Sequence, residues 1–147
     1  MKKDIENTPS DIKPLGFYIH RALCVMIKRI NKELRDQNLN FQHSDFTIMM
    51  ALERLGCLNQ SQIAKFLGKE RSAISKSLKS LENKGYIERT PMNGCTNSVS
   101  LTEKGKEIMP ALNKIADEVT DIASNGFSTK KRTEMIKNLT QVYLNCL

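Results

Sequence analysis

A run of hydrogen-bonding side chains stands near the middle of the chain. If residues 71–84 form a helix, six polar or basic side chains share one of its faces, and none of the six is acidic. They are Arg71, Ser72, Ser75, Lys76, Lys79 and Asn83. Hydroxyl, guanidinium and ammonium groups on a helix of this width match the hydrogen-bonding groups of base edges and phosphates in a major groove. The spacing indicates the chemistry of recognition, in which these groups bind a polyanion.

The opposite face of the same segment is apolar. Ile74, Leu78 and Leu81 recur at steps of four and three, which places them on one stripe of a helix. An ordinary amphipathic helix with a solvated basic face has the same pattern. The segments on either side of residues 71–84 therefore decide between the two interpretations.

The preceding segment predicts a short helix and a turn. Asn59 and Gln62 have capping-box spacing, apolar residues follow at 63, 66 and 67, and Gly68 ends the run. A short helix, a turn that contains glycine and a second helix with a polar face predict a helix-turn-helix.

The following segment predicts a β-hairpin. Gly85 occupies the position of a left-handed helix C-cap, and residues 86–89 have the composition of a short strand. Residues 91–94 are rich in turn formers, and residues 98–101 predict the returning strand. Together with the helix-turn-helix, this hairpin predicts a winged helix.

Two runs in this order resemble the MarR family of winged-helix transcription regulators. They are LNQSQIAKFLGKERSAISKSLKSLENKGYIER, at residues 58–89, and LTEKGKEI, at residues 101–108. The resemblance extends more weakly over the whole chain. It implies a sequence-specific repressor of transcription that binds double-stranded DNA and is released by a ligand, for which family members commonly use a small aromatic or phenolic molecule.

The resemblance and the polar face together define candidate DNA contacts. Arg71 and Lys76 are expected to bind guanine bidentately or a phosphate, and Lys79 to bind a phosphate. The remaining candidates are Ser72 and Ser75 on the same helix, and Gln62 and Lys65 on the helix before it.

The wing departs from the family pattern. Family members usually have an Asp-x-Arg stretch in this loop, whose Arg enters the minor groove, but residues 91–98 contain neither Asp nor Arg. Asn93 and Asn97 are the remaining candidates for minor-groove contact, and both are uncharged. We therefore expect a wing that contributes less affinity and a shallower salt dependence than a wing bearing Arg.

Composition is consistent with one mainly α domain over residues 1–147, with a small β-hairpin wing. The chain has 39% hydrophobic and 5% aromatic residues, no Trp, and a formal net charge of +7. Residues 60–104 hold 8 basic and 4 acidic side chains, which is more than half of the excess. A basic surface beside a helix-turn-helix favours duplex DNA as the partner.

Other classes of protein have little support in the sequence. It lacks a metal-spaced histidine pair, a Gly-rich phosphate loop and a nucleophile motif, so we expect no enzymatic activity and no cofactor. No segment reaches the roughly 18 apolar residues of a membrane span, and the N-terminal lysines precede no apolar run, so a cytoplasmic protein without membrane contact is expected. Four cysteines more than thirty residues apart fit neither a zinc site nor a disulfide framework.

Long amphipathic helices are expected on both sides of the DNA-binding lobe. The lobe is placed at residues 44–104, with Ser44 as a cap and the wing at about 86–101, and the flanking helices at 15–38 and 106–147. In the second flank, apolar residues at 108, 112, 115, 119 and 122 form a heptad seam. These helices either pack within one chain or, as the resemblance implies, interlock two chains into a homodimer on a pseudo-palindromic operator.

Two alternative functions remain open. The first is a thiol-based redox-sensing regulator acting through Cys24 or Cys95, since some family members sense organic hydroperoxides with a cysteine in the N-terminal helix. The second is a winged-helix protein-interaction module without DNA binding. The acid-free basic face argues against this module, because a protein-binding surface should expose apolar anchors.

Overall fold

The computed structural model describes residues 15–91 and 97–147. Its helices and strands, in chain order, are α2 (Leu15–Asp36), α3 (His43–Leu55), β1 (Leu58–Asn59), α4 (Gln60–Leu67), α5 (Arg71–Asn83), β2 (Ile87–Pro91), β3 (Asn97–Leu101), α6 (Glu103–Ala123) and α7 (Thr129–Asn145). The fold is mainly α with a small antiparallel sheet, as the sequence predicts.

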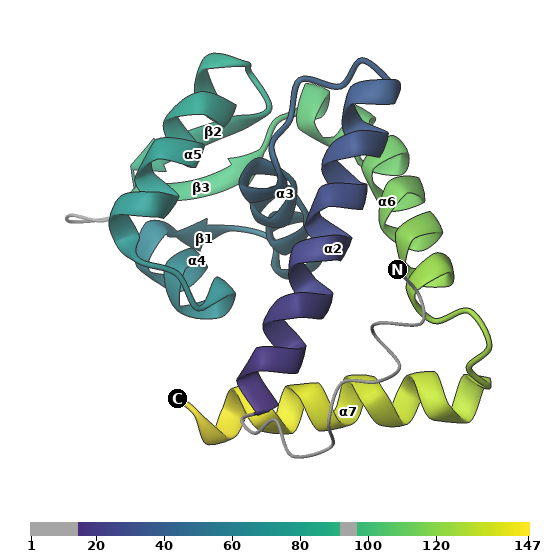
Figure 1. Ribbon diagram of the computed structural model, residues 1–147. Coiled ribbons are helices and arrows are strands. Elements are labelled where there is room, and N and C mark those ends of the chain that lie inside the picture. The colour runs from purple at the N-terminus through teal and green to yellow at the C-terminus, as the bar shows by residue number, and fades with distance from the viewer. Residues whose placement is uncertain (1–14, 92–96) are drawn as a thin grey trace.

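The elements form a lobe and a set of long helices (Figure 1). In the lobe, α3, α4 and α5 pack together beside the sheet. Helices α2 and α6 pack against each other and against α3, and α7 crosses below the start of α2. Helix α3 therefore lies between the lobe and the long helices.

The core lies where these two parts meet. Leu34 of α2, Ile48 of α3, Leu78 of α5 and Leu112 of α6 are each 0% exposed and belong to one apolar cluster. Because the cluster draws on helices from both parts, burial of its apolar surface holds the lobe against the long helices through α3.

The start of α3 differs from the expectation that Ser44 caps it. The N-cap is Gln42, whose backbone N–H donates to the Asp45 carboxylate over 3.3 Å. Ser44 lies inside the first turn, where its carbonyl accepts a hydrogen bond from the Thr47 hydroxyl. The cap is at Gln42 because the acid three residues later satisfies a backbone donor there, as in a capping box.

The sheet has three strands, although only two were expected. Its order is β1-β3-β2, with both pairs antiparallel. Strand β1 has only two residues, and Leu58 pairs with Val99 of β3 across the lobe. A two-residue strand carries no alternation by which the sequence could reveal it.

The flanking helices begin close to the expected positions. Thr102 caps α6, its hydroxyl accepting from the Gly105 N–H over 3.0 Å, so the first turn of this helix lies within the region assigned to the lobe. Ser128 caps α7 by accepting from the Lys131 N–H. None of the helices in the two described ranges has the length and apolar character needed to cross a membrane.

Candidate nucleic-acid interface

The first helix of the helix-turn-helix has the predicted cap and turn. The Asn59 side chain accepts from the Gln62 N–H over 2.9 Å, and the Gln62 side chain accepts from the Asn59 N–H over 2.8 Å. Gly68 adopts the left-handed conformation with φ 59°, and the next N–H, of Lys69, closes the turn on the Ala64 carbonyl over 2.9 Å. Glycine adopts this conformation without strain, so the chain turns directly into α5.

The second helix, α5, has one buried face and one exposed face. Ile74 is 2% exposed, and Leu78 and Leu81 are each 0% exposed, as the apolar stripe predicts. All six residues of the polar face are exposed: Arg71, Ser72, Ser75, Lys76, Lys79 and Asn83. The buried stripe holds the polar face toward solvent, which is what a helix in a major groove requires.

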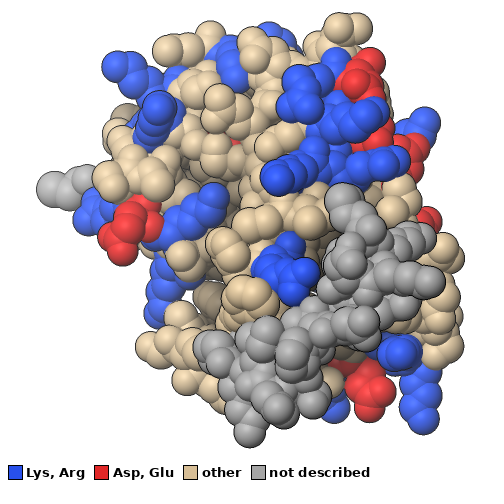
Figure 2. All heavy atoms as spheres, viewed as in Figure 1, with Lys and Arg blue, Asp and Glu red and all other residues tan. Residues whose placement is uncertain are grey.

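The cations of this face are not neutralised within the described part of the chain. Arg71, Lys76 and Lys79 form no ion pair with any residue in 15–91 or 97–147. By contrast, Arg89 of β2 pairs with Glu82 over 3.1 Å. Figure 2 shows Lys and Arg side chains projecting along the edge where α4 and α5 lie. This edge offers positive charge to an anionic partner.

Two further polar residues, Gln60 and Lys69, lie at the helix-turn-helix and were not among the candidates predicted from the sequence. The Gln60 side chain donates to the Arg71 carbonyl over 3.0 Å, which ties the first turn of α4 to the start of α5. Lys69 is exposed in the turn between these helices, two residues before Arg71 at the start of the polar face. Its position as a lysine in the turn of the helix-turn-helix was the signal that could have identified it. Gln62 and Lys65 are exposed on α4, as a backbone contact requires.

The hairpin places only part of the predicted wing. Asn97 is exposed at the start of β3, opposite Pro91 at the end of β2. Asn93 and Cys95 lie outside the described residues. Among the described residues of the hairpin, Arg89 is a cation, and its side chain points to α5, where it pairs with Glu82.

A pocket of about 430 Å³ lies at the corner between α2 and α3. It is lined by Asn31, Arg35, Phe41, Gln42, His43 and Ser44. Burial, and to a lesser degree the positive charge of Lys69, holds the pKa of His43 below its usual 6.5. The imidazole is therefore neutral near pH 7 and offers one donor and one acceptor, while Arg35 offers a fixed positive charge.

The cysteines differ in their surroundings. Cys24 is half-buried on α2, with its Sγ 3.4 Å from the Nε2 of His20. Cys57 is exposed and contacts the Ser98 hydroxyl. Cys24, Cys57 and Cys146 are free thiols. Over residues 15–91 and 97–147, no cluster of His, Cys, Asp and Glu side chains has the arrangement of a metal site.

A helix-turn-helix followed by an antiparallel hairpin, with a basic face exposed on its second helix, defines the winged helix-turn-helix class of DNA-binding proteins. Residues 41–94 match the model of the MarR family. Over this part of the chain the protein is therefore similar to the MarR family of winged-helix transcriptional regulators.

Individual relatives agree with this assignment. The chain is 26% identical over 116 residues to YybA of Bacillus subtilis, an HTH-type transcriptional regulator, covering 74% of this chain and 77% of YybA. It is 26% identical over 129 residues to SarZ of Staphylococcus aureus, another HTH-type transcriptional regulator, covering 86% and 84% of the two chains.

Solved structures agree on the fold. A MarR transcriptional regulator from Methanosarcina mazei superimposes with a TM-score of 0.81 at 23% identity, over 99% of this chain and 97% of that one. A MarR variant from E. coli, solved with operator DNA, superimposes with a TM-score of 0.75 at 20% identity, over 88% and 93% of the two chains.

Proposed function

We propose that this protein is a dimeric repressor of transcription that binds a pseudo-palindromic operator by placing one α5 helix of each protomer in the major groove. The observation that carries the proposal is the exposed face of α5 with Arg71, Lys76 and Lys79, held outward by three side chains that are at most 2% exposed. Binding alone performs this function, so no catalytic group is required. Because the proposed partner is chromosomal DNA, we place the protein in the cytoplasm.

The side chains of α5 divide into two roles. Arg71 and Lys76 carry donors suited to the O6 and N7 acceptors of guanine, and Ser72 and Ser75 supply short-range hydrogen bonds. Lys79 lies further along the helix and is assigned a phosphate, as are Gln62 and Lys65 on α4. Asn97, at the described end of the wing, is assigned the minor groove together with Asn93.

Exposed apolar side chains on the long helices support a dimer. Leu23 and Val25 of α2 are 47% and 67% exposed, and Ile122 of α6 and Ile136 of α7 are 54% and 64% exposed. The first half of α2 and α7 also line an apolar groove of about 360 Å³. Exposed apolar side chains and an apolar groove on the same helices are the surface that a second protomer could cover. A two-fold dimer would present two α5 helices to two half-sites about one DNA turn apart.

The pocket between α2 and α3 supports release by a small aromatic ligand. Arg35 offers a cation to a carboxylate, and neutral His43 offers a hydrogen bond to a phenolic hydroxyl. The pocket adjoins the N-terminal end of α3, which packs against α5. A ligand that binds one arrangement of α2 and α3 better than another would therefore change operator affinity.

The decisive experiment compares the DNA upstream of the gene with an unrelated duplex across a salt series. A footprint with two-fold symmetry and a clear specificity ratio is the expected result. Equal and steeply salt-dependent binding to both duplexes would indicate only a basic surface and contradict the proposal for this DNA.

A second candidate function is redox sensing through Cys24. The observation in its favour is the 3.4 Å contact between Cys24 Sγ and His20 Nε2, because it places a hydrogen-bonding imidazole beside the thiol. Peroxide should then weaken operator binding by the wild-type protein but not by Cys24→Ser. An affinity that peroxide leaves unchanged would remove this candidate.

A further inference from the structure

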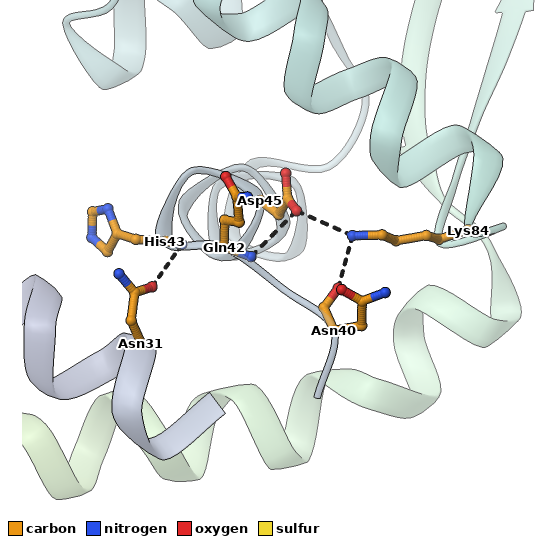
Figure 3. A network of polar contacts seen from close by, with 6 residues as sticks. All are labelled: Asn31, Asn40, Gln42, His43, Asp45 and Lys84. Carbon is orange, nitrogen blue, oxygen red and sulfur yellow. Dashed lines mark hydrogen bonds and ion pairs between the residues drawn. The ribbon is translucent and has the colours of Figure 1, made fainter. Parts of the chain in front are cut away.

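One ion pair joins the end of the recognition helix to the corner between α2 and α3. Lys84 follows the last residue of α5, and its ammonium group donates to the Asn40 carbonyl over 2.7 Å and lies 3.4 Å from the Asp45 carboxylate (Figure 3). The same ammonium group lies 5.7 Å from the centre of the Phe41 ring. The Lys84 side chain, at the C-cap of α5, thus contacts Asn40, Phe41 and Asp45.

Asp45 depends on this ammonium group. Its side chain is only 5% exposed, whereas that of Lys84 is 25% exposed. Apart from Lys84, the carboxylate accepts the Gln42 N–H at the start of α3. A buried carboxylate that loses its cation is strongly disfavoured, so the two side chains hold α3 and the end of α5 together.

The connection continues to both long helices. On one side, Asn31 of α2 accepts the backbone N–H of His43 over 3.1 Å (Figure 3). On the other side, the Lys104 ammonium group, in the first turn of α6, donates to the Lys84 carbonyl over 2.7 Å and lies 4.6 Å from the centre of the Tyr86 ring. The end of α5 is therefore tied to α2 through α3, and directly to α6.

A small tilt of α5 at its Lys84 end would displace its other end, where the proposed DNA contacts begin at Arg71. The helix has 13 residues, so at 1.5 Å per residue its first turn lies roughly 20 Å from Lys84. A tilt of about 5° at Lys84 would move Arg71 by about 2 Å. In a two-fold dimer the change occurs twice, once at each half-site.

We propose that the ion pair of Lys84 and Asp45 is a positioning contact that fixes the angle of α5 against α2 and α6, and thereby the half-site spacing that the dimer accepts. The inference rests on the proposed function, since spacing has meaning only for a dimer on a two-half-site operator. Neither residue needs to touch DNA. Replacing either residue should change the half-site spacing that the dimer prefers. It should not change the contacts that each α5 makes with its own half-site.

The test measures affinity for the operator, for operators with one or two base pairs added or removed between half-sites, and for one half-site alone. Lys84→Met removes the charge and keeps most of the stem. We expect the preference for native spacing to fall by about fivefold or more, with half-site affinity within about twofold of wild type. Lys84→Arg should retain the preference. An unchanged preference, or equal weakening on every DNA, would overturn the positioning role.

Two further variants sharpen the result. Glu82→Gln also removes an ion pair of α5, but its partner Arg89 belongs to the wing, so the spacing preference should remain. Asp45→Asn keeps an oxygen acceptor for the Gln42 N–H, and it carries the test if thermal melting shows Lys84→Met unfolded. The double variant should lose no more preference than Lys84→Met alone, because Lys84→Met already removes the contact with Asp45, and additive losses would contradict the inference.

Binding by the wild-type protein distinguishes failure of the proposed function from failure of the positioning role. A wild-type protein that binds every duplex equally contradicts the proposed function itself. A wild-type preference for one spacing that survives in both Lys84→Met and Asp45→Asn contradicts only the positioning role.

Discussion

A Cβ atom on Gly105 would overlap the carbonyl oxygen of Tyr86. The first turn of α6 thus packs directly on the backbone of Tyr86, three residues after the end of α5. Thr102 strengthens this contact, because its N–H donates to the same Tyr86 carbonyl over 3.1 Å and its hydroxyl donates to the Gly85 carbonyl over 2.6 Å. The absence of a side chain at Gly105 lets α6 pack against the base of the wing.

Gly105→Ala should therefore destabilise the fold. The added methyl group meets backbone, which cannot move aside cheaply, and overpacking of this kind costs about 1–3 kcal/mol. Gly16→Ala is the matched control, since it also lies in a helix but its Cβ would meet nothing within 4 Å. That substitution should stabilise α2 by up to about 1 kcal/mol. Urea unfolding of both variants measures the difference, and changes of the same sign would contradict the packing argument.

Charge reversal on α5 distinguishes a DNA-binding protein from a protein-interaction module. Lys76→Glu with Lys79→Glu should abolish operator binding, because two exposed cations become repulsive toward phosphates. Lys79→Ala alone should reduce the slope of log affinity against log salt by about 0.9, the value for one phosphate contact. Lys130→Glu, at an exposed position of α7, is the control and should bind as wild type. Operator binding that survives the double reversal would refute the α5 interface.

Asn97→Arg should tighten operator binding. Asn97 is exposed at the start of β3, and an arginine there would add a cation suited to the negative potential of the minor groove. The salt dependence should become steeper at the same time, since one more counterion is released. Titrations at two salt concentrations measure both effects. Unchanged or weaker affinity would mean that this end of the hairpin does not reach DNA.

Leu23→Glu should separate the protomers. Leu23 is 47% exposed in the first half of α2, and a carboxylate buried at an apolar interface is strongly disfavoured. Leu55→Glu is a matched control, because Leu55 is 46% exposed but ends α3, within the DNA-binding lobe. Light scattering during size-exclusion chromatography should give a monomer for Leu23→Glu and a dimer for Leu55→Glu. Two dimers would place the interface elsewhere.

His43 should make the fold less stable in mild acid. Because its pKa is lowered in the folded state, the unfolded chain binds a proton first as the pH falls below 6.5. The stability contributed by neutral His43 is present above that pH and is lost as the pH falls toward the folded-state value. Urea unfolding at pH 7.5 and pH 5 should show a larger loss for wild type than for His43→Gln. Equal losses would mean that other groups cause the acid sensitivity.

Local patterns in the sequence determined most of the DNA-binding lobe. The capping box of Asn59 and Gln62, the left-handed Gly68 and the buried face of Leu78 each depend on residues within about one or two helical turns. Such short-range relationships have the same physical basis in any fold. They were therefore readable before any tertiary contact was known, and with them the exposed basic face.

Only the tertiary structure decided how that face is held. Strand β1 exists because Leu58 meets Val99, 41 residues away, and Lys84 reaches Asp45 from 39 residues away. From the sequence Ser44 was expected to cap α3, and nothing in it indicated that the Asp45 carboxylate would be buried against the end of α5. Distant partners leave no periodic signal, because their meeting depends on how whole helices pack and not on the spacing of neighbours along the chain.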